Sequence, residues 1–167
     1  RIDRPASGVI LFAKTPRAAQ SLNVQFQERS VEKTYLAVVG QLPDPKEGTL
    51  EHLLQRNART NKAQVVSAKT KQSKQATLHY RWLSSIERYH LLEVQLQTGR
   101  YHQIRAQLAA IGSPLKGDVK YGFRRSNADR SIHLHAWKLS FTHPVNGERI
   151  LLEAPLPQET VWQAFEH

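Results

Sequence analysis

The fold is decided by residues 92–111, LEVQLQTGRYHQIRAQLAAI, where a strand pattern changes into a helix pattern. Apolar and polar side chains alternate over the first six residues, which is the two-residue period of a half-buried strand. Residues 98–102, TGRYH, interrupt this alternation. Over 103–111 the apolar side chains recur at helical spacing, so a helix is predicted there. The junction between the two elements carries Arg100 and His102, which makes it a candidate functional segment.

The rest of the chain contains short strand patterns and a few helix patterns. Thr15 and Pro16 form a preferred pair at a helix start, and a helix is predicted from there to about Glu28. A further helical pattern lies over 161–165. Strands are predicted at 9–13 (buried), 33–39, 65–66, 76–82, 137–141 and 149–153. Many short strands with few helices predict a single α+β domain, with a mixed, largely antiparallel sheet flanked by helices.

The chain is strongly basic. Its 167 residues contain 24 Lys and Arg against 14 Asp and Glu, which gives a formal net charge of +10 and a pI near 10.2. This excess predicts an anionic partner, with nucleic acid ahead of a membrane surface. No apolar run reaches the roughly 18 residues of a spanning helix. No signal-peptide pattern is present, so a cytoplasmic protein is expected. The lack of cysteine excludes disulfides, Cys-ligated zinc and thiol catalysis.

Much of the positive charge lies between His52 and Ile86, a stretch with seven Lys and Arg and no acidic residue. Two interpretations of this stretch remain open. It is either a solvated loop with an exposed sheet face, or a surface that contacts phosphates. In the second case Arg56, Arg59 and Lys62 are candidate RNA contacts.

Several common catalytic sites find no support. His133 and His135 are two residues apart on a predicted strand, but a zinc site needs further ligands, so packing or RNA contact is favoured and no metal site is predicted. Neither a Gly-x-Ser-x-Gly elbow nor a phosphate-binding Gly-x-x-x-x-Gly-Lys loop occurs.

A carboxylate among cations is the remaining candidate. Asp3 lies between Arg1 and Arg4, before the first predicted strand. A carboxylate that acts as a nucleophile must stay ionised, and a guanidinium within about 4–6 Å, such as that of Arg105, holds its pKa down. Spacing alone does not bring Arg105 to Asp3, and a surface ion pair between Asp3 and its neighbouring arginines is the alternative.

Five segments carry a family resemblance. Residues 1–11, RIDRPASGVIL, match a catalytic motif written His-Arg-Leu-Asp-x-x-Thr-Ser-Gly, and residues 33–39, KTYLAVV, match a tyrosine motif. Residues 98–105, TGRYHQIR, match Thr-Gly-Arg-x-His-Gln-Ile-Arg, and two later segments, at 117–122 and 134–144, match in order. In this arrangement the chain resembles the RluA-type RNA pseudouridine synthases of the RluA/RsuA superfamily.

The resemblance implies isomerisation of uridine to pseudouridine in structured RNA, ribosomal or transfer, without cofactor or metal, on a mixed sheet with a central active-site cleft. It places Asp3 as the catalytic aspartate, Tyr35 as the active-site tyrosine and Arg105 as the basic partner of the aspartate. Arg1 matches an arginine that fills the gap left by a flipped nucleotide. Further RNA contacts are expected at Arg4, Arg100 and His102.

The resemblance leaves several alternatives open. The chain has no methionine and lacks the leading His of the first motif, so residues 1–167 are expected to be a catalytic domain that lacks a preceding strand and possibly an S4-like RNA-binding domain. A monomer is expected. The alternative function is a basic RNA-binding domain that has lost catalysis, and a metal-dependent RNA enzyme that uses the histidines is a distant third.

Overall fold

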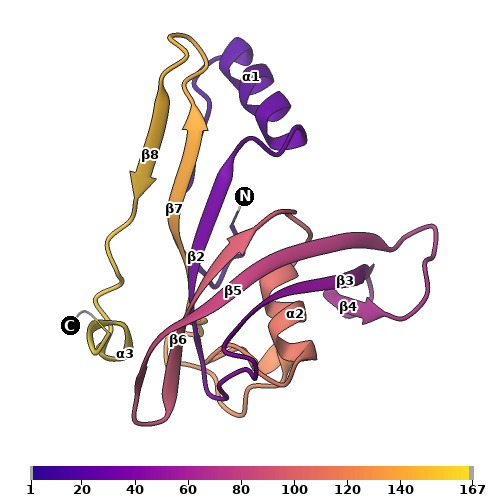
Figure 1. The fold of residues 1–167 in the computed structure, drawn as a ribbon, viewed down its shortest axis with the longest axis vertical. Helices are drawn as coiled ribbons and strands as arrows, with labels where there is room; N and C mark the ends of the chain where they lie inside the picture. Colours follow the sequence, from indigo (N-terminus) through magenta and orange to yellow (C-terminus); the bar gives the residue numbers. More distant parts are fainter. Residues whose placement is uncertain (1, 166–167) are drawn as a thin grey trace.

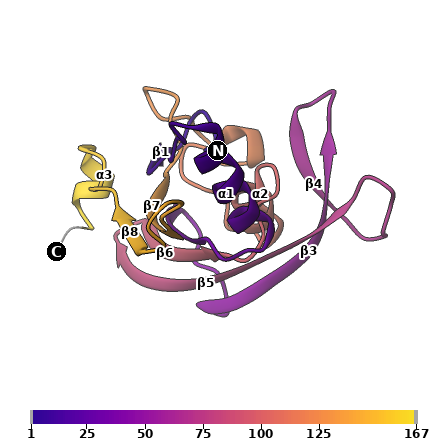
Figure 2. The same cartoon turned by 90° about the horizontal axis from the view of Figure 1, so that it is seen from above.

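A single curved sheet organises the molecule (Figures 1 and 2). The computed structural model describes residues 2–165, and within them the sheet order is β1-β7-β2-β6-β5-β3-β4, with β8 also paired to β7. The strands are β1 (Ser7–Gly8), β2 (Glu32–Val39), β3 (Glu47–Asn57), β4 (Lys62–Val66), β5 (Lys74–Ile86), β6 (Tyr89–Leu96), β7 (Leu134–Thr142) and β8 (Arg149–Glu153). The helices are α1 (Pro16–Gln27), α2 (Gln103–Ala110), the short 3-10 helix η1 (Val119–Tyr121) and α3 (Thr160–Gln163).

The pairing confirms the predicted fold class. β1 pairs with β7 in parallel, and the other strand pairs of the described sheet are antiparallel. The fold is therefore α+β with a mixed, largely antiparallel sheet. The predicted helix start is also confirmed, because Thr15 Oγ1 accepts a hydrogen bond from Ala18 N at 3.2 Å.

Both faces of the central strand β2 are buried in its second half, residues 36–39. Ala37 and Val39 point to the concave face, where they belong to the main core together with Ile104 and Leu108 of α2. The neighbouring residues on β2 point to the opposite face, which the buried Trp162 of α3 helps to cover. Figure 2 shows α2 and the N-terminal segment inside the curve of the sheet, and α3 outside it. Because β2 and β6 are held in the core, they are rigid supports for the residues that face the concave side.

The buried strand predicted at 9–13 is wrong. β1 comprises Ser7 and Gly8, and the next residue, Val9, donates one further hydrogen bond to Ala136 O at 2.8 Å before the chain leaves the sheet. Phe12 is 81% exposed. The reason is competition for one edge of β7. From Lys138 onward β8 pairs with this edge, so its backbone groups are not available to residues 9–13.

The described helices are short. No helix within residues 2–165 has the length and apolar character needed to cross a membrane. α1 buries Leu22 against Val31 and Phe141, whereas Phe26, one turn further on, is 41% exposed and lines the cavity described below.

The close approach of β1 to β7 gives a stability prediction. Gly8 has a φ of +119°, and a Cβ at this position would collide with the backbone of Ala136. We expect Gly8→Ala to lower the free energy of unfolding by more than the ~1–3 kcal/mol typical of backbone strain alone. Urea unfolding followed by circular dichroism measures this. Gly147→Ala is the matched control, because Gly147 also has a positive φ of +75° but nothing within 4 Å of its Cβ position. Equal losses in both variants would contradict the collision.

Candidate active site

The segment between β6 and α2 is held by two buried polar side chains. Thr98 Oγ1 accepts a hydrogen bond from Thr77 N at 2.9 Å and donates one to Gln103 Oε1 at 2.8 Å. Gln103 Oε1 also accepts from Arg100 N at 2.9 Å, and Gln103 Nε2 donates to Thr77 O at 3.1 Å. Two backbone N–H groups are satisfied in this way, that of Thr77 on β5 and that of Arg100 in the turn. His102 then adopts a left-handed conformation with a φ of 50° immediately before α2. A strained conformation at the start of a helix points to a functional constraint on this residue.

Arg105, on the first turn of α2, forms a buried bidentate ion pair with Asp118. Arg105 Nε donates to Asp118 Oδ2 at 2.7 Å and a terminal nitrogen, NH2, donates to Oδ1 at 2.8 Å. Burial lowers the pKa of Arg105, but the hydrogen bonds and charge of Asp118 outweigh this effect and leave the pKa above its ordinary value. The guanidinium is therefore permanently charged and fixed in one orientation.

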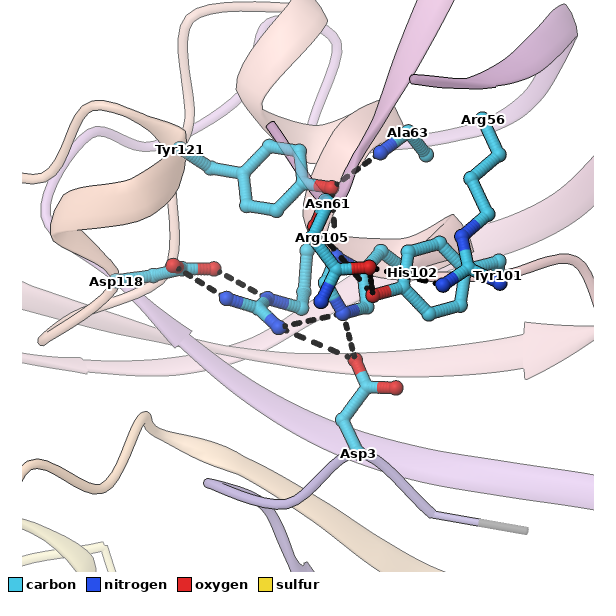
Figure 3. A network of polar contacts seen from close by, with 9 residues as sticks. All are labelled: Asp3, Arg56, Asn61, Ala63, Tyr101, His102, Arg105, Asp118 and Tyr121. Atoms are coloured by element: carbon cyan, nitrogen blue, oxygen red, sulfur yellow. Dashed lines mark hydrogen bonds and ion pairs between the residues drawn. The ribbon is translucent and has the colours of Figure 1, made fainter. Parts of the chain in front are cut away.

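The same guanidinium faces Asp3 (Figure 3). Its second terminal nitrogen, NH1, lies 3.5 Å from Asp3 Oδ2. The predicted encounter of these two residues, which are far apart in sequence, is thus present, but Asp118 is the tighter partner of Arg105. The predicted lowering effect of Arg105 on the pKa of Asp3 is present, but it does not dominate. Burial raises the pKa of Asp3, and the opposing effect of Arg105 is smaller, because the pair is long and the carboxyl is largely removed from water.

A cavity of about 690 Å³ surrounds Asp3. This volume lies within the range of roughly 300–1,000 Å³ that is typical of small-molecule sites. Asp3 is the only acidic residue among the described residues that line the cavity. Five cations line it as well: Arg4, Lys33, Arg100, Arg105 and Lys120. The cavity therefore combines one carboxylate with several positively charged side chains. Such a lining favours binding of an anionic polymer that places one neutral group in the cavity.

Tyr35 also lines the cavity. Its strand, β2, shifts register against β7 between Thr34 and Tyr35, an irregularity of the kind that is common next to active sites. Burial, together with the negative charge of Asp3, raises the pKa of Tyr35 to about 12. The phenol is therefore protonated at neutral pH and can donate a hydrogen bond, or offer its ring face to a bound base.

The other predicted RNA contacts fall into three groups. Arg4 and Arg100 line the cavity. Arg56, Arg59 and Lys62 belong to the β3–β4 hairpin, where Arg56 lies over the ring of Tyr101 at 4.3 Å and Lys62 over that of Tyr121 at 5.2 Å. Arg1 lies outside the described residues.

His102 also lines the cavity, but its side chain is only 9% exposed. One ring nitrogen, Nδ1, lies 2.8 Å from the hydroxyl of Tyr121, and the other, Nε2, lies 3.1 Å from NH1 of Arg105. Both nitrogens are therefore engaged inside the protein. Burial and the neighbouring charges of Arg105 and Lys120 lower the pKa of His102 to about 4. The ring is neutral at pH 7, so its 3.9 Å approach to Asp3 is no ion pair.

Sequence reasoning assigned no role to Asp118 and Tyr121, which hold this network together. Both belong to the segment Gly117-Asp118-x-x-Tyr121-Gly122. The sequence signal that could have indicated their role is the acidic residue directly after a glycine. Gly117 has a φ of +85°, and a Cβ there would collide with Asn127. The turn that directs Asp118 inward therefore requires glycine.

His133 and His135 pack in the core. Both are 2% exposed, and the ring of His133 stacks on Trp162. His133 Nε2 also contacts Glu159 Oε2 at 2.9 Å. In the described part of the chain no three His, Asp or Glu side chains come together in a way that could hold a metal ion. The Nδ1 atom of His135 lies 2.8 Å from Ser7 Oγ, so both histidines have contacts within the protein.

Comparisons with known proteins identify the family of this chain. Residues 1–110 match the family model described as RNA pseudouridylate synthase, and the chain belongs to that family. It is 38% identical to the uncharacterized RNA pseudouridine synthase YlyB of Bacillus subtilis over 159 residues, and 39% identical to the ribosomal large subunit pseudouridine synthase D of Nitrosomonas europaea over 170 residues. Each alignment covers 95% of this chain but 52% and 47% of the relative, so the chain spans about half the length of these proteins.

A solved structure shares the fold. The protein called human RNA Pseudouridylate Synthase Domain Containing 4 superposes with a TM-score of 0.77 at 25% identity, over 95% of this chain and 70% of that one. The predicted family resemblance is confirmed.

The buried ion pair gives a prediction about folding. Arg105→Met leaves the carboxylate of Asp118, 1% exposed, without its cation, and such a loss costs about 3–5 kcal/mol. Asp118→Leu in the same chain removes the stranded charge, so the double variant is expected to recover most of this stability. Urea unfolding of the parent, the single variant and the double variant tests this. A double variant no more stable than Arg105→Met would contradict the prediction.

Proposed function

We propose that this chain is the catalytic domain of an RNA pseudouridine synthase that isomerises uridine to pseudouridine. The observation that carries the proposal is Asp3, the one acid among the described cavity-lining residues, facing a guanidinium that Asp118 holds in place. In the reaction the N1–C1′ bond of uridine breaks, the uracil turns, and a C5–C1′ bond forms. The C5 proton leaves and N1 gains a proton, so atoms and electrons balance without a redox partner.

Asp3 acts on the reacting nucleotide in this proposal, either by covalent attachment or by stabilising positive charge and moving a proton. Arg105 supplies the opposite charge that keeps the carboxylate in position and ionised. Its effect is needed because burial by itself favours the protonated acid. Tyr35 remains a phenol and contacts the base.

RNA is the substrate class that fits the surface. A uridine inside a helix cannot reach Asp3, so the nucleotide is flipped into the cavity at a cost of a few kcal/mol. The cations around the cavity and on the β3–β4 hairpin offset this cost by contacts to phosphates. Arg1, which directly precedes the described residues, is proposed to fill the gap that the flipped nucleotide leaves.

The wider properties of the enzyme are proposals of the same kind. The names of several relatives refer to the large ribosomal subunit, so we propose ribosomal RNA as the first substrate to test and transfer RNA as the second. Residues 1–167 would be the catalytic part of a longer cytoplasmic protein that acts as a monomer.

Substitution of the acid tests the function. Asp3→Asn preserves the size of the side chain but removes its charge, so we expect turnover to disappear while the Kd for RNA changes by less than about threefold. The assay uses in vitro transcripts of ribosomal and transfer RNA labelled with tritium at uracil C5, because C5–C1′ bond formation releases this hydrogen. An active Asp3→Asn variant would contradict the role of Asp3. A parent chain that binds these transcripts but releases no tritium would favour the inactive RNA-binding alternative.

The raised pKa of Asp3 also predicts a pH-dependent stability difference. A carboxyl whose pKa is higher in the folded than in the unfolded protein stabilises the fold below its unfolded pKa, and this contribution is lost as the pH rises through the folded pKa. We therefore expect Asp3→Asn to melt at a higher temperature than the parent at pH 7, and the difference to shrink towards pH 3.5. Thermal unfolding across this range measures it. A variant less stable than the parent at pH 7 would show that the contact with Arg105 outweighs desolvation.

A further inference from the structure

The imidazole of His102 connects the candidate catalytic pair to the β3–β4 hairpin, whose turn residue Asn61 lines the same cavity. Its Nε2 lies 3.1 Å from NH1 of Arg105, the same nitrogen that faces Asp3. Its Nδ1 lies 2.8 Å from the hydroxyl of Tyr121. Figure 3 shows the ring between these groups, with Asp3 on the adjacent side.

The chemistry of the two partners assigns the tautomer of His102. A guanidinium nitrogen can only donate, so Nε2 must accept the hydrogen bond from Arg105 and cannot carry a proton. The single proton of the neutral ring is then on Nδ1 and is donated to the oxygen of Tyr121. In this tautomer both hydrogens of Arg105 NH1 have an acceptor: one faces His102 Nε2 and the other faces Asp3. Asp118 holds the other side of the guanidinium.

The β3–β4 hairpin is attached to this ring from two directions. The oxygen of Tyr121 also accepts a hydrogen bond from Ala63 N, on β4, at 2.8 Å. The ring of Tyr101 stacks on that of His102 with the centroids 3.9 Å apart. Tyr101 in turn donates from its hydroxyl to Asn61 Oδ1 at 2.9 Å, in the hairpin turn. The hairpin that carries Arg56, Arg59 and Lys62 is thus bonded to the ring that orients Arg105.

We propose that His102 is a positioning residue for the reaction. Its Nδ1–H tautomer, fixed by Tyr121, presents Nε2 as the acceptor that aims NH1 of Arg105 at Asp3, and the β3–β4 hairpin supports this arrangement through Tyr121 and Tyr101. The inference rests on the proposed function and deepens it. It replaces the expected direct contact between His102 and RNA, because both ring nitrogens are already bonded within the protein.

The test compares variants that remove or restore the two hydrogen bonds. His102→Phe keeps the stacking but loses both bonds, and the single-turnover rate constant is expected to fall about 10- to 100-fold. His102→Gln offers an amide that both donates and accepts, so partial rescue is expected. Tyr121→Phe removes one bond without changing the strained residue and should lower the rate about fivefold. For all three variants the Kd for RNA is expected to stay within about twofold of the parent.

If His102 only supported the fold and did not position Arg105, its substitution would leave the pH dependence of the reaction rate unchanged. Asp3 faces Arg105, Asp118, Tyr35 and His102. Arg105 is the one cation among them that lowers its pKa, and loosening of Arg105 therefore shifts the acid limb of the rate profile of His102→Phe to higher pH. His79→Phe, on β5 and in contact with Thr49 and Glu47, is the matched control and is expected to leave rate and profile unchanged.

The outcomes separate the inference from the proposed function. An active parent with an unchanged rate in His102→Phe would overturn the inference and leave the function intact. Weaker RNA binding at an unchanged rate would restore the RNA-contact role of His102. The ring tautomer needs no turnover for its detection: ¹⁵N NMR of the histidine ring at pH 7 is expected to show a protonated Nδ1. A protonated Nε2 would overturn the inference even if the parent proves inactive on every transcript.

Discussion

The buried ion pair between Arg105 and Asp118 is the constraint on which the rest of the site depends. It fixes two of the three guanidinium nitrogens and leaves the third free to face Asp3 and His102. A guanidinium held only by Asp3 could follow that carboxylate towards solvent, since the side chain of Asp3 is 23% exposed. Because Asp118 is 1% exposed and bonds two nitrogens of Arg105, it holds the positive charge beside Asp3.

The site balances two opposing effects on one carboxyl group. Removal from water favours the neutral acid, and the guanidinium favours the carboxylate. A buried carboxylate with few compensating contacts is reactive but lowers the stability of the fold. Such a loss of stability is common at sites where function requires a strained arrangement. The left-handed backbone of His102 is a second example. Its φ is unfavourable, but this conformation places the ring between Arg105 and Tyr121.

Much of the fold could be predicted because its signals are local. The alternation in β6, the helical spacing in α2 and the cap at Thr15 each depend on residues within one or two turns of each other, and the strand, the helix and the cap are present in the structure. The run at 9–13 has an equally clear apolar pattern, yet it lies outside the sheet. The edge of β7 with which residues 9–13 would pair is occupied by β8, a segment more than 130 residues away. A local sequence pattern contains no information about such competition.

The class of the molecule can be predicted from its amino-acid sequence alone, because the motifs around Asp3, Tyr35 and Arg105 have a recognisable order and spacing. Which charged groups contact each other depends on the three-dimensional fold. Arg105 is 13 residues from Asp118 and 102 from Asp3, and nothing in either separation says that the first pairing is tight and the second long. Burial decides this, since a fully enclosed carboxylate needs the bidentate contact more than a partly hydrated one. The proposed tautomer of His102 also depends on tertiary structure, because Tyr121, which accepts the Nδ1 proton in this proposal, is 19 residues away.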